Sequence, residues 1–234
     1  MSFTTRLVEV RTKILKENDV AARRLRQRFA EQGRTVISLV SSPGAGKTRL
    51  LEETVRRLAT RYRVAVVVGD LATDNDAERL AGTGVLVKQI TTGTVCHLEA
   101  EMVSKAIDSW SEIALDFLFL ENVGNLVCPA GYDLGENLRI VAFSVTEGED
   151  KPLKYPTIFN TADAVVLTKM DLCEATEFDE PEARRSIRQG RPGMRVMKVS
   201  AKTGEGMADW TAWLEKSREF DKPSSLDVGK SQGT

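Results

Sequence analysis

A stretch of eight residues carries the strongest chemical signal in this chain of 234 residues. It reads Ser-Ser-Pro-Gly-Ala-Gly-Lys-Thr over residues 41–48, after an apolar run at 36–40 and before a helical pattern at 49–61. A strand, a glycine-rich loop, a Lys-Thr pair and a helix form the arrangement that binds nucleotide phosphates. Glycines let successive backbone N–H groups turn toward an anion, and the positive end of the following helix points to the same place. We therefore predict a phosphate-binding loop.

Two side chains of this loop have chemistry suited to a nucleotide. Lys47 can reach the terminal phosphates, and the Thr48 hydroxyl can ligate Mg²⁺. Ser41 stands where the usual pattern has its first glycine, but the strand and helix that the motif requires are both expected here. The residues predicted to contact the nucleotide are Gly44, Ala45, Gly46, Lys47, Thr48 and Arg49.

Two carboxylates are placed to complete a Mg²⁺ site. Asp70 and Glu121 each end an apolar segment that is typical of a buried strand, and such strand ends meet at one edge of a parallel sheet. Mg²⁺ prefers hard oxygen ligands and usually takes one or two carboxylates from protein. The predicted catalytic set is Lys47, Thr48, Asp70 and Glu121, of which the last three are the predicted Mg²⁺ ligands. Glu121 could instead cap a helix or loop, and Asp74 and Asp76 could either join this site or simply begin the next helix.

Composition narrows the class of protein. The chain has 33 basic and 34 acidic residues, so it lacks the excess of positive charge typical of nucleic-acid binding. No apolar run approaches the length of a membrane span, and the first residues lack the apolar core of a signal peptide. Three scattered cysteines do not suggest a disulfide framework. We expect a soluble, cytoplasmic protein that binds neither nucleic acid nor membrane.

The rest of the chain alternates between apolar runs and helical patterns. The expected strands are 36–40, 64–68, 85–90, 117–120, 140–145, 164–168 and 195–199, and residues 97–110 are expected to form a helix. Continuous apolar runs separated by helices indicate a mainly parallel sheet with helices on both faces. The sequence therefore predicts an α/β P-loop NTPase fold, with ligands at the carboxyl ends of the strands.

Three regions are expected along the chain. Residues 1–33 carry apolar side chains at helical spacing and end at Gly33, which predicts a helical extension packed on the main domain. Residues 34–218 form the predicted domain that binds nucleotide and metal. Residues 219–234 are rich in Ser, Gly, Lys and Asp without periodicity, which predicts a disordered tail.

Two motifs late in the chain indicate which base is bound. Residues 168–171, Thr-Lys-Met-Asp, resemble the guanine-recognition motif Asn-Lys-x-Asp, and residues 200–202, Ser-Ala-Lys, resemble the loop with which GTPases contact the guanine carbonyl. The Asp171 carboxylate can accept hydrogen bonds from the N1–H and the amino group of guanine, a donor pair that adenine lacks. The Lys169 stem can lie along the base. GTP and GDP are therefore the expected ligands, bound at this end by Lys169, Asp171, Ser200, Ala201 and Lys202.

A second group of ligating side chains lies elsewhere in the sequence. The chain's one histidine, His97, adjoins Cys96, and Cys128 follows Glu121 by a few residues. Thiolate and imidazole groups bind Ni²⁺ and Zn²⁺, and three ligands leave a position open for water or for a second subunit. Free cysteines are often only small buried apolar side chains, and that alternative stays open. We interpret Cys96, His97 and Cys128 as a Ni²⁺ or Zn²⁺ site, and Cys173 as structural.

Together these motifs resemble the HypB family, the GTPases that deliver nickel during maturation of nickel–iron hydrogenase. The resemblance extends from the N-terminal helix to about residue 215, and its segments are 41–48, 73–77, 96–98, 121–129 and 144–156. It implies a SIMIBI-type G domain, slow Mg²⁺-dependent GTP hydrolysis, and a nucleotide-promoted homodimer. It also implies a Ni²⁺/Zn²⁺ site at the dimer interface, with Cys96, His97 and Cys128 as ligands. The implied partners are the nickel metallochaperone HypA and, indirectly, the hydrogenase large subunit.

Three features depart from the family pattern. Thr168 replaces the usual asparagine, and Thr94 and Val95 stand where a Lys-Gly-like pair is expected. The cysteine motif or histidine-rich tract found near the N-terminus of some members does not occur in this sequence. Two alternative functions stay open: maturation of urease by a related GTPase, and a metal carrier in which GTP is mainly a structural ligand.

Overall fold

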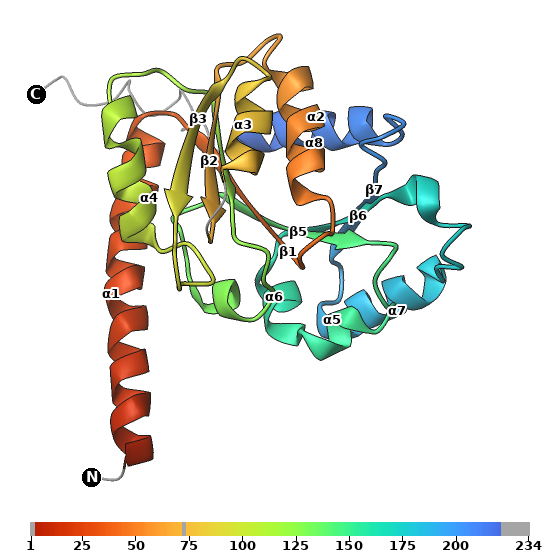
Figure 1. The fold of residues 1–234 in the computed structure, drawn as a ribbon, viewed down its shortest axis with the longest axis horizontal. Helices are drawn as coiled ribbons and strands as arrows, with labels where there is room; N and C mark the ends of the chain where they lie inside the picture. The colour runs from red at the N-terminus through yellow and green to blue at the C-terminus, as the bar shows by residue number, and fades with distance from the viewer. Residues whose placement is uncertain (1–2, 72–73, 221–234) are drawn as a thin grey trace, which may run out of the picture.

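A parallel sheet forms the centre of the computed structural model, which describes residues 3–71 and 74–220, and the side chains of residues 12–71 and 74–218. Within these residues the sheet has seven strands in the order β3-β2-β4-β1-β5-β6-β7, and each pairing is parallel (Figure 1). The strands are β1 Thr35–Ser41, β2 Val64–Asp70, β3 Leu86–Thr91, β4 Phe117–Glu121, β5 Leu138–Ser144, β6 Ala164–Thr168 and β7 Arg195–Lys198. The predicted strands and the α/β fold are thereby confirmed.

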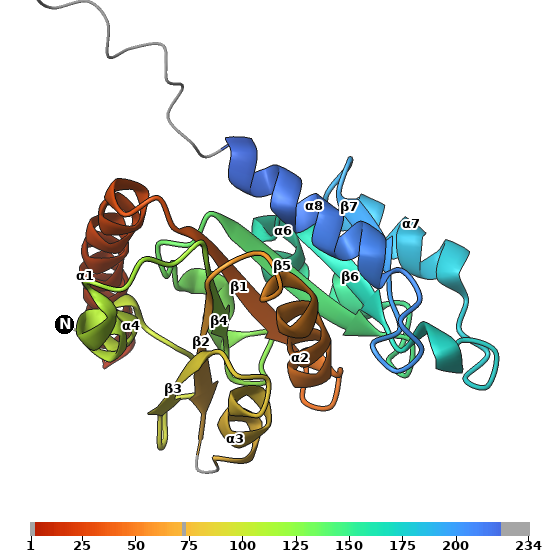
Figure 2. The same ribbon diagram turned by 90° about the horizontal axis from the view of Figure 1, so that it is seen from above.

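Helices cover both faces of the sheet (Figures 1 and 2). The α-helices are α1 Phe3–Glu31, α2 Lys47–Leu58, α3 Asn75–Ala81, α4 Ala100–Ile107, α5 Lys151–Lys154, α6 Pro156–Thr161, α7 Glu180–Gly190 and α8 Met207–Phe220. The part of the chain that the structure describes also forms short 3₁₀ turns, η1 Asp108–Trp110, η2 Cys128–Gly131 and η3 Met170–Leu172. Helices α2, α3 and α8 pack on one face, and α1, α4, α6 and α7 pack on the other.

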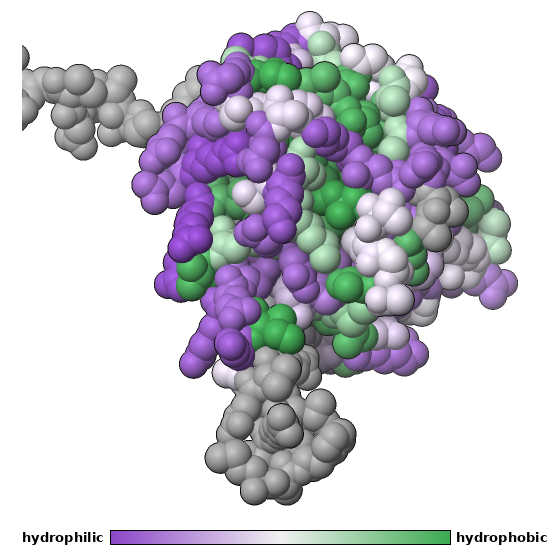
Figure 3. All heavy atoms as spheres, turned by 60° about the vertical axis from the view of Figure 1, so that its left-hand side comes forward, coloured by the Kyte–Doolittle hydropathy of each residue, from purple (hydrophilic) through white to green (hydrophobic). Residues whose placement is uncertain are grey.

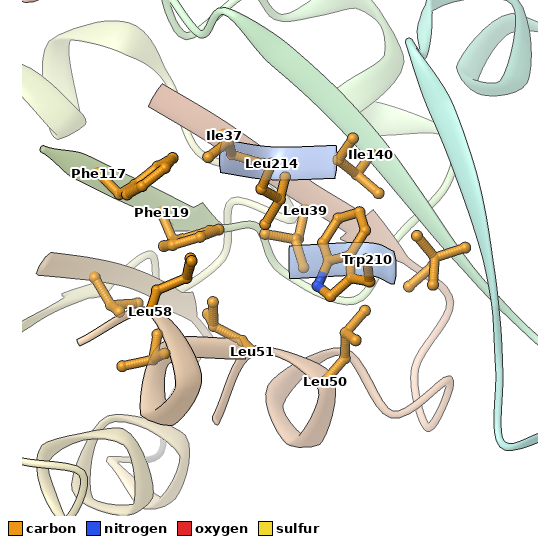
Figure 4. Close-up of a cluster of buried hydrophobic side chains, with 14 of the residues drawn as sticks. Ile37, Leu39, Leu50, Leu51, Leu58, Phe117, Phe119, Ile140, Trp210 and Leu214 are labelled. Atoms are coloured by element: carbon orange, nitrogen blue, oxygen red, sulfur yellow. The ribbon is translucent and has the colours of Figure 1, made fainter. Parts of the chain in front are cut away.

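The period of two along each strand divides the core between the two faces. In β1, Ile37 and Leu39 point into the cluster beneath α2 and α8, where they lie near Trp210 (Figure 4). Val36 and Val40 point to the opposite face and join the clusters under α1 and α4 and under α6 and α7. The central strands are buried on both faces, which explains why they appear in the sequence as unbroken apolar runs.

The long helix α1 packs its C-terminal half on the domain and lies beside α4 (Figure 1). Its buried positions among the described side chains follow helical spacing: Asn18, Ala22, Leu25 and Phe29. The Asn18 side chain donates to the carbonyl of Asp133 at 2.8 Å and accepts from the N–H of Ala100 at 2.9 Å, so this polar residue ties α1 to two other segments. Gly33, with φ of 62°, follows the end of the helix as predicted. Hydrophilic side chains dominate the outer surface of this side (Figure 3).

Several boundaries differ from the prediction by a few residues, and part of the chain lies outside the described residues. The helix expected over 97–110 begins only at Ala100. The expectation was therefore wrong for His97, which lies in the loop before this helix. Helix α8 continues to Phe220, past the expected start of the tail. Residues 72–73 and 221–234 are not among the described residues, so the predicted tail and part of the 73–77 motif stay untested. Among the helices formed by residues 3–71 and 74–220, none combines the length and apolar character needed to cross a bilayer.

Candidate functional site: a nucleotide cleft beside a thiol–imidazole cluster

The loop between β1 and α2 has the conformation that the sequence predicts. Gly44 and Gly46 have φ values of 74° and 85°, in the left-handed region that favours glycine. The carbonyl of Gly46 accepts from the N–H of Leu50 at 2.9 Å, which starts α2 directly after the loop. A cavity of about 450 Å³ opens over residues 41–49 and over the ends of β2 and β4. The loop and helix therefore surround a space suited to a chain of phosphates.

Glu121, at the end of β4, is the acceptor for both polar side chains at the start of α2. Its Oε1 atom lies 2.7 Å from Lys47 Nζ and accepts from the Thr48 hydroxyl at 2.6 Å. Glu121 is 1% exposed, and its Oε2 atom is buried without a hydrogen-bond partner among the described residues. A buried carboxylate oxygen without a donor is costly, and a cation would satisfy it. The sequence-based placement of Glu121 beside Lys47 and Thr48 is what the structure shows.

Two of the other three carboxylates considered border the cavity, whereas Asp74 precedes α3 and does not line it. Asp70 ends β2 and Asp76 lies in the first turn of α3, and both line the cavity. Asp76 thus both begins a helix and faces the cleft, so the two interpretations of this residue are compatible. The Thr48 hydroxyl and the carboxylates of Asp70 and Glu121 are hard oxygen donors at one edge of the sheet, which fits Mg²⁺.

A second cavity lies at the same edge of the sheet, next to the ends of β6 and β7. It measures about 240 Å³, and its walls include Gly46, Arg49, Thr168, Lys169, Asp171, Ala201 and Lys202. The hydroxyl of Ser200 donates to Asp171 Oδ1 at 2.6 Å, and Lys202 Nζ lies 3.9 Å from Asp171 Oδ2. The two motifs predicted to recognise the base, 168–171 and 200–202, are thus brought together around one cavity.

Two residues at the start of the 168–171 motif, Thr168 and Lys169, form hydrogen bonds with the phosphate-binding loop. The Thr168 hydroxyl donates to the carbonyl of Ala45 at 2.6 Å, and Lys169 Nζ donates to the carbonyl of Gly44 at 2.7 Å. Lys169 itself has φ of 59°, an uncommon backbone conformation for a residue with a side chain. The base cavity and the phosphate cavity are therefore neighbours, and Gly46 and Arg49 line both of them.

The three predicted soft-metal ligands come together, two from the loop before α4 and one from the start of η2. Their ligating atoms all lie within 4.8 Å of one another. Cys96 Sγ lies 2.7 Å from Cys128 Sγ and 4.0 Å from His97 Nδ1, and both cysteines are free thiols. The His97 ring packs on Tyr132 with 3.8 Å between ring centroids. Cys173 lies elsewhere and contacts the carbonyl of Phe178, as expected for a structural cysteine.

The environment of Cys96 and His97 favours the uncharged form of each side chain. The hydrogen bond to the Cys128 sulfur, together with burial, raises the pKa of the Cys96 thiol. Burial lowers the pKa of His97, although the nearby Glu99 carboxylate opposes this shift. The lowered pKa favours the neutral imidazole, which is the form that binds metal, and a metal that binds Cys96 must displace the proton of that thiol. His97 Nε2 lies 3.5 Å from Glu99 Oε1, so this carboxylate can orient the ring with Nδ1 toward the thiols.

Residues that the sequence did not single out connect the nucleotide cleft with the thiol–imidazole cluster. The side-chain oxygen of Asn122 accepts from the N–H of Leu98 at 3.0 Å, which joins the end of β4 to the loop that carries His97. A Cβ atom on Gly124 would lie 3.2 Å from the Cα of Pro43, so the segment that leads to Cys128 packs directly on the phosphate-binding loop. These contacts join the phosphate-binding loop, the end of β4 and the loop that carries His97.

The fold and the cleft define a P-loop nucleotide-binding protein, and the adjacent cluster adds a potential metal site. Residues 35–198 match the family model described as "CobW/HypB/UreG, nucleotide-binding domain". The chain is 44% identical to the hydrogenase maturation factor HypB of Azotobacter chroococcum mcd 1 over 228 residues, covering 97% of this chain and 75% of that protein. It is 46% identical to HypB of Escherichia coli strain K12 over 216 residues, covering 91% of this chain and 73% of that protein.

A solved structure agrees with these matches. The crystal structure of HypB from Helicobacter pylori in complex with nickel is 39% identical in sequence, with a TM-score of 0.83 that covers 89% of this chain and 98% of that chain. The chain therefore belongs to the CobW/HypB/UreG family, and within it to the HypB proteins. The resemblance inferred from the motifs is confirmed.

Proposed function

We propose that this protein is a Mg²⁺-dependent GTPase that binds Ni²⁺ and delivers it during maturation of nickel–iron hydrogenase. One observation carries the proposal: the segment from Glu121 to Cys128 begins in the nucleotide cleft and ends at a cluster of three metal-binding side chains. The names of its HypB relatives, which are hydrogenase maturation factors, support the same conclusion.

In the nucleotide cleft, this chain's residues would hold and polarise the phosphates. The N–H groups around Gly44 and Gly46, the positive end of α2 and the Lys47 ammonium would stabilise the negative charge that develops on the terminal phosphate. Mg²⁺, held by Thr48, Asp70 and Glu121, would neutralise phosphate charge when bound. Lys47, now paired with Glu121 at 2.7 Å, would exchange that partner for the phosphates. We propose slow turnover, because histidine is the usual general base and the chain's one histidine belongs to the proposed metal site. No histidine therefore lines the nucleotide cavity to activate the attacking water.

At the base cavity, Asp171 would select guanine. Its carboxylate is held by the Ser200 hydroxyl, with Lys202 nearby, and so is positioned to accept from the N1–H and amino group of the base. The backbone of Ala201 would contact the guanine carbonyl. Adenine has an acceptor at N1 and would place it against the Asp171 carboxylate, which can also only accept, so no hydrogen bond would form there.

In the metal site, Ni²⁺ is cargo rather than a permanent cofactor. Cys96, His97 and Cys128 supply three ligands and leave at least one coordination position open, which suits transfer. Zn²⁺ fits the same donors. Because the thiols must be reduced to bind metal, the proposed setting is the cytoplasm.

We further propose that the open position lies at a homodimer interface formed in the GTP-bound state. Val127, next to Cys128, is 65% exposed, and an apolar cavity of about 260 Å³ lies beside it. An exposed apolar side chain next to an incomplete metal site favours a second copy as its cover. The proposed upstream partner is the metallochaperone HypA, and the final recipient is the hydrogenase large subunit.

Two sets of variants test the proposal. Lys47→Ala is expected to abolish Mg²⁺-dependent GTP turnover while Ni²⁺ binding is kept. Cys96→Ala and Cys128→Ala are expected to lose Ni²⁺ binding in calorimetric titrations while GDP binding is kept, and Cys173→Ala is the matched control. Turnover at the parent rate in Lys47→Ala would refute the catalytic part. Parental Ni²⁺ affinity in both cysteine variants would refute the site.

A further inference from the structure

Thr168 has a single proton to donate, and the structure shows where that proton goes. The residue is 3% exposed at the end of β6, and its hydroxyl lies 2.6 Å from the carbonyl oxygen of Ala45. A carbonyl oxygen can only accept, so Thr168 must be the donor. A hydroxyl carries one hydrogen, and once it is given to Ala45 only lone pairs remain on the oxygen.

Thr168 also lines the base cavity, where a hydrogen-bond donor would be needed to contact guanine N7. Guanine presents N7 as an acceptor, and an acceptor needs a donor opposite. The Thr168 hydroxyl cannot donate to N7, because it already donates its proton to the Ala45 carbonyl. An asparagine at the same position has two N–H donors on one nitrogen, one for the Ala45 carbonyl and a second for N7.

We infer that Thr168 acts as a positioning residue that fixes the phosphate-binding loop, and that this protein binds the guanine base without a hydrogen bond to N7. The inference rests on the proposed guanine-nucleotide function and adds to it how the base is recognised. Base selection then depends on Asp171 and on the loop at Ala201. Thr168 and Lys169 together connect the base cavity to the carbonyls of Ala45 and Gly44.

Comparison of GDP with 7-deaza-GDP tests the inference, because the second ligand has a C–H in place of N7. Equilibrium competition against a fluorescent GDP analogue gives the affinity of each ligand, and ADP is included as a third ligand. The parent protein is expected to bind GDP and 7-deaza-GDP within about twofold of each other. Thr168→Asn is expected to create a preference for GDP of about five- to tenfold, the usual effect of one hydrogen bond.

Thr168→Val separates the two roles of the residue, because it keeps the branched shape and removes the hydroxyl. It is expected to weaken GDP and 7-deaza-GDP by the same factor, about three- to tenfold, since the contact with Ala45 is lost for both. A parent that prefers GDP over 7-deaza-GDP by fivefold or more, while rejecting ADP, would overturn the inference and leave the guanine function intact. A parent that binds ADP as tightly as GDP would overturn the proposed function itself.

Discussion

Replacing Asn122 with alanine is expected to damage the metal site and spare the nucleotide site. The Asn122 side-chain oxygen accepts from the N–H groups of Leu98 at 3.0 Å and Val123 at 2.9 Å, and Asn122 is 2% exposed. In the variant both N–H groups lose this acceptor, at a cost of about 1–3 kcal/mol for each buried group. Because the smaller side chain lets water reach part of the site, we expect a total loss of about 2–4 kcal/mol in the free energy of unfolding.

The metal affinity is expected to fall because Leu98 directly follows His97. Without its bond to Asn122, the loop that carries Cys96 and His97 is no longer fixed against the end of β4. Loss of a group that orients metal ligands typically weakens binding by about 10- to 100-fold. Within residues 3–71 and 74–220, the hydrogen bonds of the Asn122 side chain go to Leu98 and Val123 and not to Lys47 or Glu121, so GDP affinity is expected to change little.

Calorimetric titration of Ni²⁺ and of GDP, with urea unfolding alongside, measures these three effects. Asn137→Ala is the matched control, because its side-chain oxygen accepts from the N–H of Val36 at 2.7 Å at the opposite end of β1. The control is expected to lose stability and to keep its Ni²⁺ affinity. Equal Ni²⁺ affinities in the parent and Asn122→Ala would refute the reasoning. An equal loss of Ni²⁺ affinity in Asn122→Ala and Asn137→Ala would also refute it, because the loss would then come from general destabilisation of the fold.

Two further predictions concern stability. Burial alone would raise the pKa of Asp116, but its hydrogen bonds from Arg63 and the charge of Arg218 hold that pKa below the usual value. A carboxyl whose pKa is lower in the folded state than in the unfolded state stabilises the folded protein at pH values above its unfolded-state pKa, near 4. This stabilisation is lost as the pH falls through the folded-state pKa. Asp116→Asn should therefore lower Tm at pH 7 and have a shrinking effect in acid; a deficit that persists unchanged at pH 3 would contradict this. Trp210→Phe removes the bond from Trp210 Nε1 to Thr54 at 2.8 Å in the core, and we expect a loss of about 1–3 kcal/mol in urea unfolding. A loss below about 0.5 kcal/mol, the usual range for surface changes, would contradict that expectation.

The sequence predicts the sheet and the cleft because their signals are local. Buried parallel strands are continuous apolar runs, and the chemistry-bearing residues Lys47, Thr48 and Glu121 follow strand ends or start a helix. Proximity of these residues then follows from the topology, since carboxyl ends of parallel strands meet at one edge. The same reasoning places Asp171 and Ser200 around one cavity, where they bond at 2.6 Å.

The contacts between the two sites could not be predicted in this way. Asn122 and Leu98 are far apart along the chain, and neither residue type identifies its partner. Gly124 looks like an ordinary loop glycine until its distance from Pro43 is known. The sequence therefore indicates both sites and the segment 121–128 that runs between them, whereas the individual contacts that fix this segment come only from the three-dimensional structure.

That connection makes the nucleotide state and the metal affinity interdependent in the proposed mechanism. The most direct test is the Kd for Ni²⁺ of the parent protein saturated with Mg·GDP and, separately, with Mg²⁺ and a non-hydrolysable GTP analogue. We predict values that differ by at least about tenfold, which corresponds to about 1.4 kcal/mol of coupling. Equal Ni²⁺ affinities in the two states would contradict the switch, because a nucleotide without differential coupling shifts nothing, and would favour a metal carrier that uses GTP as a structural ligand.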